Sequence, residues 1–405
     1  MISLSNGSQE RSIFRSRYRL AASMRNTAVL KHQTMFFIAA LMLLSMSSAW
    51  SQESTSDAAG DVEPAETRTG AEQENTGGFV PVPIFITEPA IGEGLGLGIV
   101  YFHEQSTPER NRLNTGRSVM STGRESKAPP TATGIFGFRT NDGSEGYGVG
   151  HARTFQEDTY RLVGAAAEAD IEATYYLGDV PFKFSVDGQV IFSRLLRRIG
   201  DSNFFGGGAV SATDANADFR SGLVDFSFTD IGIAAIAIYD ARDDTMLPSD
   251  GLLGEFSVWH YDEALGGDFD YQKIGLKLNS FHKLGERFVL GMRLQADSAD
   301  GDVPFYAEPY VSLRGIPALR YLGDTATVVE VEGRFRVADR WIVLSFAGKG
   351  FVDSRSGVEK SEDDIDSIGA GFRYLMLPKQ NVWLGVDVAR GPEEDFGYIQ
   401  IGSPW

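Results

Sequence analysis

The side chains that most often carry out chemistry are sparse and scattered in this sequence. The five histidines form no His-x-x-x-His pair, and no Gly-x-Ser-x-Gly elbow is present. Cysteine is absent, which excludes disulfides and thiolate metal sites. The histidines are His32, His103, His151, His260 and His282. This distribution predicts a protein that is not an enzyme and that holds no metal and no cofactor.

Four stretches resemble ligand-binding or catalytic motifs without fitting them. Residues 92–98 alternate glycine with glutamate and leucine, but they lack the Gly-Lys-Ser/Thr ending of a phosphate loop and no helical pattern follows. Ser257 and His260 have opposite parity in an extended segment, so they do not share a face. The acidic runs 362–364 and 393–395 are expected to be solvated loops.

The charge balance limits the classes of partner that the protein is expected to bind. The formal net charge is −18, which argues against nucleic acid or a surface of anionic headgroups, since both require clustered lysine and arginine. With 405 residues, the chain has room for one large all-β unit or two ordinary domains.

The N-terminal region has the features of an export signal. Residues 35–49 are apolar or small and too short to span a bilayer as a helix, and basic residues precede them. We therefore expect residues 1–51 to contain a signal peptide that is cleaved after Ala49 or Ser51, and a start at Met24 would give it an ordinary length. Residues 52–78 are rich in Ser, Thr, Ala, Glu and Gly, which predicts a disordered periplasmic leader.

Beyond this leader the sequence alternates with a period of two, and the two faces differ. In residues 328–337, an apolar face is opposed by Glu330, Glu332, Arg334 and Arg336. The same pattern recurs in residues 271–280, 287–296 and 381–389. One apolar face and one face with charges of both signs is the arrangement that a transmembrane barrel needs, with lipid outside and a polar lumen inside.

These segments predict an all-β fold from residue 79 to residue 405, a 16-stranded antiparallel transmembrane β-barrel. Residues 104–130 are polar and form the longest break between strands. The last segment, residues 396–405, is aromatic-rich and suits a strand that closes the barrel, with Trp405 at the membrane–water boundary.

Three motifs resemble the BamA/TamA superfamily of outer-membrane barrels, the bacterial surface antigen family. Residues 239–251 are similar to its Asp-x-Arg-Asp…Pro-x-x-Gly signature, residues 304–316 look like its sixth extracellular loop, and residues 396–405 are similar to its closing-strand signal. The signature residues are Asp240, Arg242, Asp243, Pro248 and Gly251. The loop tetrad is Leu313, Arg314, Gly315 and Ile316, and the closing signal comprises Phe396, Tyr398, Ile399, Ile401, Gly402 and Trp405.

The resemblance implies that the sixth loop folds back into the barrel and that its arginine pairs with acidic residues of the inner wall. The expected partners of Arg314 are Glu332 first and Glu330 second. The family's Phe-x-Asp-x-Gly segment is replaced here by residues 346–350, Phe-Ala-Gly-Lys-Gly, so the second acidic partner is expected to be missing.

The resemblance also implies a function in inserting or translocating proteins or lipids at the outer membrane, with outer-membrane lipids and periplasmic or outer-membrane assembly factors as partners. About 30 residues separate the signal peptide from the first strand, too few for a POTRA domain, so we expect a POTRA-less, monomeric barrel. Two alternatives stay open: a structural surface antigen, or a passive pore for small solutes. The pore would be lined by Lys273, Arg293, Glu332, Arg334 and Asp387.

Overall fold

The computed structural model describes residues 78–88, 91–103, 131–177, 180–219, 225–353, 365–377 and 382–405. The signal peptide, the leader up to residue 77, the segment 104–130 and the acidic run 362–364 lie outside these residues. Gly78, which the sequence placed in the leader, is the first residue of the first strand. Within the described ranges, no helix has the length and apolar character that crossing a membrane would require.

The described chain is almost entirely β-strand. The strands are β1 (Gly78–Glu88), β2 (Gly92–Phe102), β3 (Ala132–Thr140), β4 (Glu145–Phe155), β5 (Tyr160–Leu177), β6 (Val180–Arg198), β7 (Phe204–Phe219), β8 (Asp225–Asp240), β9 (Gly251–Tyr261), β10 (Tyr271–Leu284), β11 (Phe288–Gly301), β12 (Thr325–Ala338), β13 (Trp341–Asp353), β14 (Ile365–Leu377), β15 (Val382–Arg390) and β16 (Asp395–Ile401). Two short 3-10 helices, η1 (Glu263–Leu265) and η2 (Phe305–Ala307), lie in the connections before β10 and β12.

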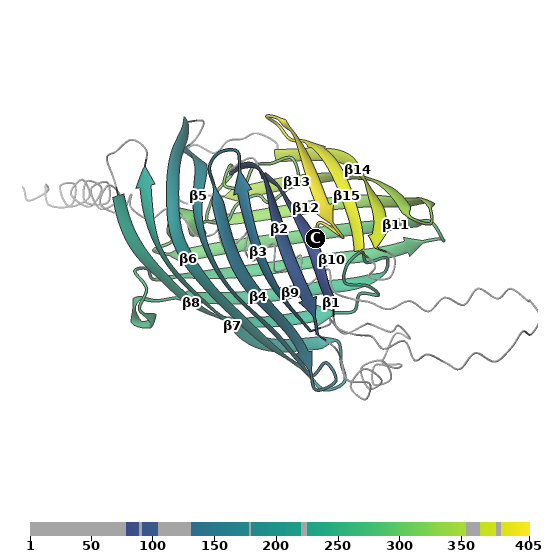
Figure 1. The fold of residues 1–405 in the computed structure, drawn as a ribbon, viewed down its shortest axis with the longest axis horizontal. Helices are drawn as coiled ribbons and strands as arrows, with labels where there is room; N and C mark the ends of the chain where they lie inside the picture. The colour runs from purple at the N-terminus through teal and green to yellow at the C-terminus, as the bar shows by residue number, and fades with distance from the viewer. Residues whose placement is uncertain are drawn as a thin grey trace, which may run out of the picture.

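The strands form one antiparallel sheet in sequence order, from β1 to β16 (Figure 1). The sheet curves until β1 and β16 lie beside each other, but no ladder of backbone hydrogen bonds joins these two strands in the described part of the chain. The predicted 16-stranded antiparallel barrel is therefore confirmed, and it is nearly closed. We call the line where β1 and β16 meet the seam.

The two faces of the barrel follow the alternation of the sequence. In β12, Val329 and Val331 are 40% and 47% exposed on the outside, whereas Glu330 and Glu332 are buried on the inside. Outward apolar side chains meet lipid in a transmembrane barrel, so their exposure has no cost there. Charged side chains that are buried inside need partners.

Part of the interior is apolar, in addition to the polar lumen that the sequence predicted. Phe184 and Val186 of β6 point inward and are buried against Phe228 of β8 and Tyr306 of η2. The reason is that the loop between β11 and β12 enters the barrel and brings its own apolar side chains to pack there.

The ends of the barrel are distinguished by the chain direction. We call the end at which β1 begins and β16 finishes the proximal end, and the opposite end the distal end. The connection 241–250, between β8 and β9, lies at the proximal end, and the connection 302–324, between β11 and β12, starts from the distal end. These two connections carry two of the three predicted motifs.

Candidate functional site in the barrel lumen

The tip of the connection 302–324 is shaped by a tight turn. The Ile316 amide donates to the Leu313 carbonyl at 3.1 Å, and Gly315 has a φ of +91°. A Cβ at Gly315 would lie 3.1 Å from backbone atoms of Arg390 and Gly391, so only glycine combines this dihedral with this close approach. The Gly315 amide donates to the Tyr398 hydroxyl at 2.8 Å. The loop tip is thereby held against β15 and β16.

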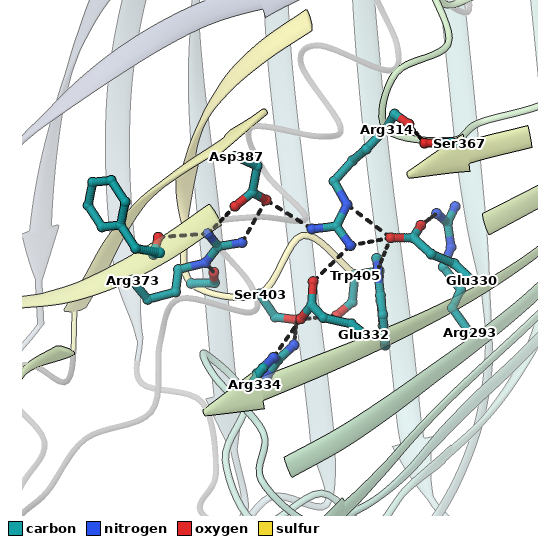
Figure 2. Close-up of polar contacts among 12 residues, drawn as sticks. Arg293, Arg314, Glu330, Glu332, Arg334, Ser367, Arg373, Asp387, Ser403 and Trp405 are labelled. Carbon is teal, nitrogen blue, oxygen red and sulfur yellow. Dashed lines mark hydrogen bonds and ion pairs between the residues drawn. The ribbon is translucent and has the colours of Figure 1, made fainter. Parts of the chain in front are cut away.

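Arg314 lies at the centre of the site and is only 7% exposed (Figure 2). Its Nε donates to Glu330 Oε1 at 2.9 Å, and its Nη1 donates to Asp387 Oδ2 at 2.9 Å. Its Nη2 makes a second, shorter contact with Glu330 and lies 2.8 Å from Glu332 Oε2. The guanidinium carbon is 3.4 Å from the centre of the Phe346 ring. Charge pairing and stacking on an aromatic face are the interactions that a desolvated guanidinium requires.

Three further arginines complete the network. Arg293 Nη1 donates to Glu330 Oε2 at 3.4 Å, and Arg334 Nε donates to Glu332 Oε1 at 2.6 Å. Arg373 donates two hydrogen bonds to Asp387, from Nη1 to Oδ1 at 2.5 Å and from Nη2 to Oδ2 at 2.9 Å.

Four arginines thus share three buried carboxylates, contributed by β11, the loop, β12, β14 and β15. Because the arginines outnumber the carboxylates by one, removal of a carboxylate would leave more of the buried positive charge uncompensated, which is costly in a low-dielectric interior.

The structure places both predicted glutamates against Arg314 but changes their order. Glu330 accepts hydrogen bonds from Arg314, whereas Glu332 meets it as an ion pair and accepts a hydrogen bond from Arg334. The expectation of a missing second acidic partner was wrong, because Asp387 of β15 supplies it. Asp387 and Arg373 could have been found as inward charges within otherwise apolar strands, but their pairing depends on strand order in space.

Residues 402–405, which we call the tail, turn into the lumen after β16. Gly402 has a φ of +75°, and a Cβ there would meet the Met246 side chain at 2.6 Å. The Ser403 amide donates to the Met246 carbonyl at 2.8 Å, and Arg373 Nε donates to the Gly402 carbonyl at 3.0 Å. Arg334 Nη2 donates to Ser403 Oγ at 2.8 Å. The arginines of the network therefore bind the tail as well.

Trp405 is inside the barrel, and the prediction that it sits at the membrane–water boundary was wrong. Its indole Nε1 donates to Glu330 Oε1 at 3.2 Å (Figure 2). Its ring stacks on the buried Phe281, with ring centres 5.5 Å apart. A Cβ at Gly291 would lie 2.8 Å from the indole, so this glycine makes room for the ring. The positive φ of Gly402 directs the tail inward, which an alternating sequence pattern does not reveal.

The signature residues of the connection 241–250 fix its shape. Asp243 accepts from the amides of Ser249 and Asp250 at 2.9 and 3.0 Å. A Cβ at Gly251, which has a φ of +113°, would lie 2.2 Å from the Ala241 carbonyl oxygen. The Pro248 carbonyl accepts from Arg334 Nη1 at 3.0 Å, and this bond joins the connection to the central network.

The remaining signature residues form a second ion-pair cluster at the proximal end. Asp240 is buried and accepts from Arg242 Nε at 3.0 Å and from Arg161 Nη1 at 3.1 Å. Arg161 also binds Asp158, which in turn pairs with Arg198. This cluster ties the connection between β8 and β9 to the neighbouring turns 156–159 and 199–203.

The closing-strand residues divide between the two faces of β16. Tyr398 lies opposite Asp387 in the β15–β16 ladder, and its hydroxyl accepts a hydrogen bond from the loop tip. Ile399 lies opposite Val386. Phe396 lies opposite Ala389, and Ile401 ends the strand opposite Leu384. The three predicted motifs, far apart in the sequence, thus meet around one set of buried charges.

The barrel fold is similar to the folds of known structures. The crystal structure of BamA from Haemophilus ducreyi lacking POTRA domains 1–3 is similar with a TM-score of 0.56, at 13% identity, over 81% of this chain and 70% of that one. CdiB from Escherichia coli gives a TM-score of 0.56 at 11% identity, over 82% of this chain and 63% of that one.

CdiB from Acinetobacter baumannii gives a TM-score of 0.52 at 11% identity, over 80% of this chain and 59% of that one. At these identities the similarity shows the fold alone, and this chain spans less than two thirds of either CdiB chain. A search of curated proteins found no match. The model of the Omp85 superfamily domain matches residues 94–315, more than half of the sequence. The chain belongs to the Omp85 superfamily of outer-membrane barrels.

Proposed function

We propose that this barrel inserts or translocates proteins or lipids at the outer membrane and that the seam between β1 and β16 is its working edge. The observation that carries the proposal is the absence of a backbone ladder between these two strands in the described chain, although they lie side by side. Strand edges with unpaired N–H and C=O groups are templates for the addition of another strand.

The central network supports this proposal, because it attaches the loop and the tail to strands of the wall while the seam stays unjoined. Arg314 connects the loop to β12 and β15, and the tail connects β16 to the same residues. We propose that this network is a lock, with Leu313, Arg314, Gly315 and Ile316 as the loop side and Glu330, Glu332 and Asp387 as the wall side. It holds the loop inside the lumen.

The setting that we propose follows from the family and the sequence. The signal peptide would direct export and be removed, the proximal end would face the periplasm, and the barrel would act as a monomer. Client recruitment would depend on periplasmic or outer-membrane assembly factors. We assign the barrel neither nucleic-acid binding nor a catalytic role.

A passive pore is the less favoured function, because the inward charges are engaged with one another. Of the side chains expected to line such a pore, Arg293, Glu332, Arg334 and Asp387 all belong to the network. Charges that pair with each other are poorly placed to conduct ions.

A disulfide across the seam tests the proposed function. The chain contains no cysteine, so a cysteine in β1 and one in β16 can be introduced without competing thiols. The pair Val386→Cys with Ile399→Cys is the control, because these residues already face each other in the β15–β16 ladder. We expect oxidation of the seam pair to abolish insertion of an unfolded barrel substrate into liposomes and reduction to restore it. Full activity with the seam oxidised would overturn the proposal.

A further inference from the structure

Two histidines that are far apart in the sequence meet on the outer surface of the barrel. His103 Nε2 lies 2.8 Å from Thr133 Oγ1, which lies 2.8 Å from His151 Nδ1. Sheet pairing explains the meeting, since Thr133 is opposite His151 in the β3–β4 ladder and opposite Tyr101 in the β2–β3 ladder. We call these three residues and Arg153 the outer polar row.

The outer polar row continues an apolar strip that faces lipid. Ile99, Ile135 and Val149 are 39%, 56% and 44% exposed, and each shares its strand face with one residue of the row. Because β2 and β4 end, and β3 begins, at the proximal end, the row lies between this strip and that end. The polar groups therefore lie next to the end of this strip, where the headgroup of a lipid would be if its acyl chains packed along the strip.

Aromatic rings mark the same level as a membrane interface. Phe79 packs on Tyr101 with ring centres 4.8 Å apart, Tyr101 packs on His103 at 5.0 Å, and Phe155 stacks on Tyr160 at 5.2 Å. Girdles of aromatic side chains lie at the headgroup level of membrane barrels. The outer polar row is thus placed at the depth of lipid headgroups in the leaflet on the proximal side.

The chemistry of the row suits an oxyanion. A threonine hydroxyl donates one hydrogen bond, so with neutral rings it donates to one imidazole and accepts from the other. The ring that accepts from the hydroxyl carries its own proton on its other nitrogen, and this N–H can donate to an anion. Each imidazole also keeps a second nitrogen outside these hydrogen bonds. Arg153, two residues after His151 on the same face, adds a permanent positive charge.

We propose that the outer polar row binds the phosphate of a phospholipid whose acyl chains lie along Ile99, Ile135 and Val149. A phosphate diester offers the acceptor oxygens that the row can bind, and the apolar strip accounts for a lipid in preference to free phosphate. The net charge of −18 argued against anionic headgroups as partners, but this row is a local basic site on an acidic protein. The site goes beyond the proposed seam function and does not depend on it.

Lipid binding to the purified full-length barrel in detergent micelles tests the site. The probe is phosphatidylglycerol, counted as bound lipid by native mass spectrometry. The comparison ligands are diacylglycerol with the same acyl chains, which lacks the phosphate, and inorganic phosphate, which lacks the chains. The variants are Thr133→Val and the pair His103→Gln with His151→Gln. His282→Gln is the control, because His282 is an exposed residue at the proximal part of β10, outside the row.

We expect the histidine pair variant to bind phosphatidylglycerol about tenfold more weakly, since the loss of one hydrogen bond to a charged group weakens an affinity by about tenfold or more. Thr133→Val, which preserves shape, should weaken binding in the same direction, and His282→Gln should leave it unchanged. Equal binding in all variants would overturn the proposal, as would diacylglycerol binding as tightly as phosphatidylglycerol. Saturation of the site by inorganic phosphate with the same dependence on the row would also overturn it, since it would make the ligand a free anion.

Discussion

Arg314 and Trp405 donate to the same oxygen atom, Oε1 of Glu330, from opposite ends of the C-terminal part of the barrel. One residue belongs to the loop that enters from the distal end, and the other belongs to the tail that enters from the proximal end. Glu330 therefore joins the loop and the strand beside the seam in a single contact.

Replacement of Arg314 by alanine should destabilise the barrel by about 3–5 kcal/mol, because Glu330, Glu332 and Asp387 would each lose a buried ion pair. The measurement is urea unfolding followed by heat-modifiable migration in gels. The matched control is Arg390→Ala, whose ion pair with Asp395 is exposed, and it should cause no measurable loss. Equal stability of the two variants would show that the buried pairing does not hold the loop.

Asp387→Asn should destabilise the barrel nearly as much as Arg314→Ala, because Asp387 binds both Arg314 and Arg373. The double variant should lose less than the sum of the single losses, since the two residues act in one network. A double-mutant cycle by the same unfolding assay measures this coupling. Additive losses would contradict a direct interaction.

Trp405→Phe should cost about 1 kcal/mol, the typical value of one hydrogen bond, because phenylalanine keeps the stack on Phe281 but cannot donate to Glu330. Trp405→Ala should cost more, since the ring contact is lost as well. A membrane-boundary role would give a different result, because phenylalanine and alanine would then change membrane anchoring and leave the stability of the loop untouched. Protease sensitivity of the loop distinguishes the two outcomes.

Glu308, in the connection 302–324, makes the stability of the folded protein depend on pH. Burial, together with the nearby Asp324, raises its pKa to about 7. Folding thus favours the protonated form, so the contribution of Glu308 to stability is complete below the unfolded-state pKa and is lost as the pH rises through about 7.

Glu308→Gln, which mimics the protonated acid, should match the wild type at about pH 4, below the unfolded-state pKa, and exceed its stability at about pH 8. Thermal unfolding of both proteins at the two pH values checks this. A constant difference between them would contradict it.

The sequence predicted the fold well because lipid outside and charge inside impose a period of two that is visible strand by strand. Val329 and Glu330 already show which face is which. The positions of Glu330 and Glu332 beside Arg314 could be predicted for the same reason, because the loop motif indicated that the loop folds into the barrel.

The rest of the site depends on contacts that no local pattern encodes. Asp387 reaches Arg314 because β15 lies near the loop tip, and Trp405 reaches Glu330 because Gly402 turns the tail inward. The pairing of His103 with His151 through Thr133 likewise requires the register of three strands. Side chains that meet across strands become visible only when strand order and register are known.

The conductance of the barrel in a planar lipid bilayer tests the central claim most directly, that the loop is fastened inside the lumen by buried charges. We predict little steady current from the wild type and frequent openings from Arg314→Ala, because the freed loop would no longer be held against the wall. A large, steady current from the wild type, unchanged in Arg314→Ala, would contradict the account.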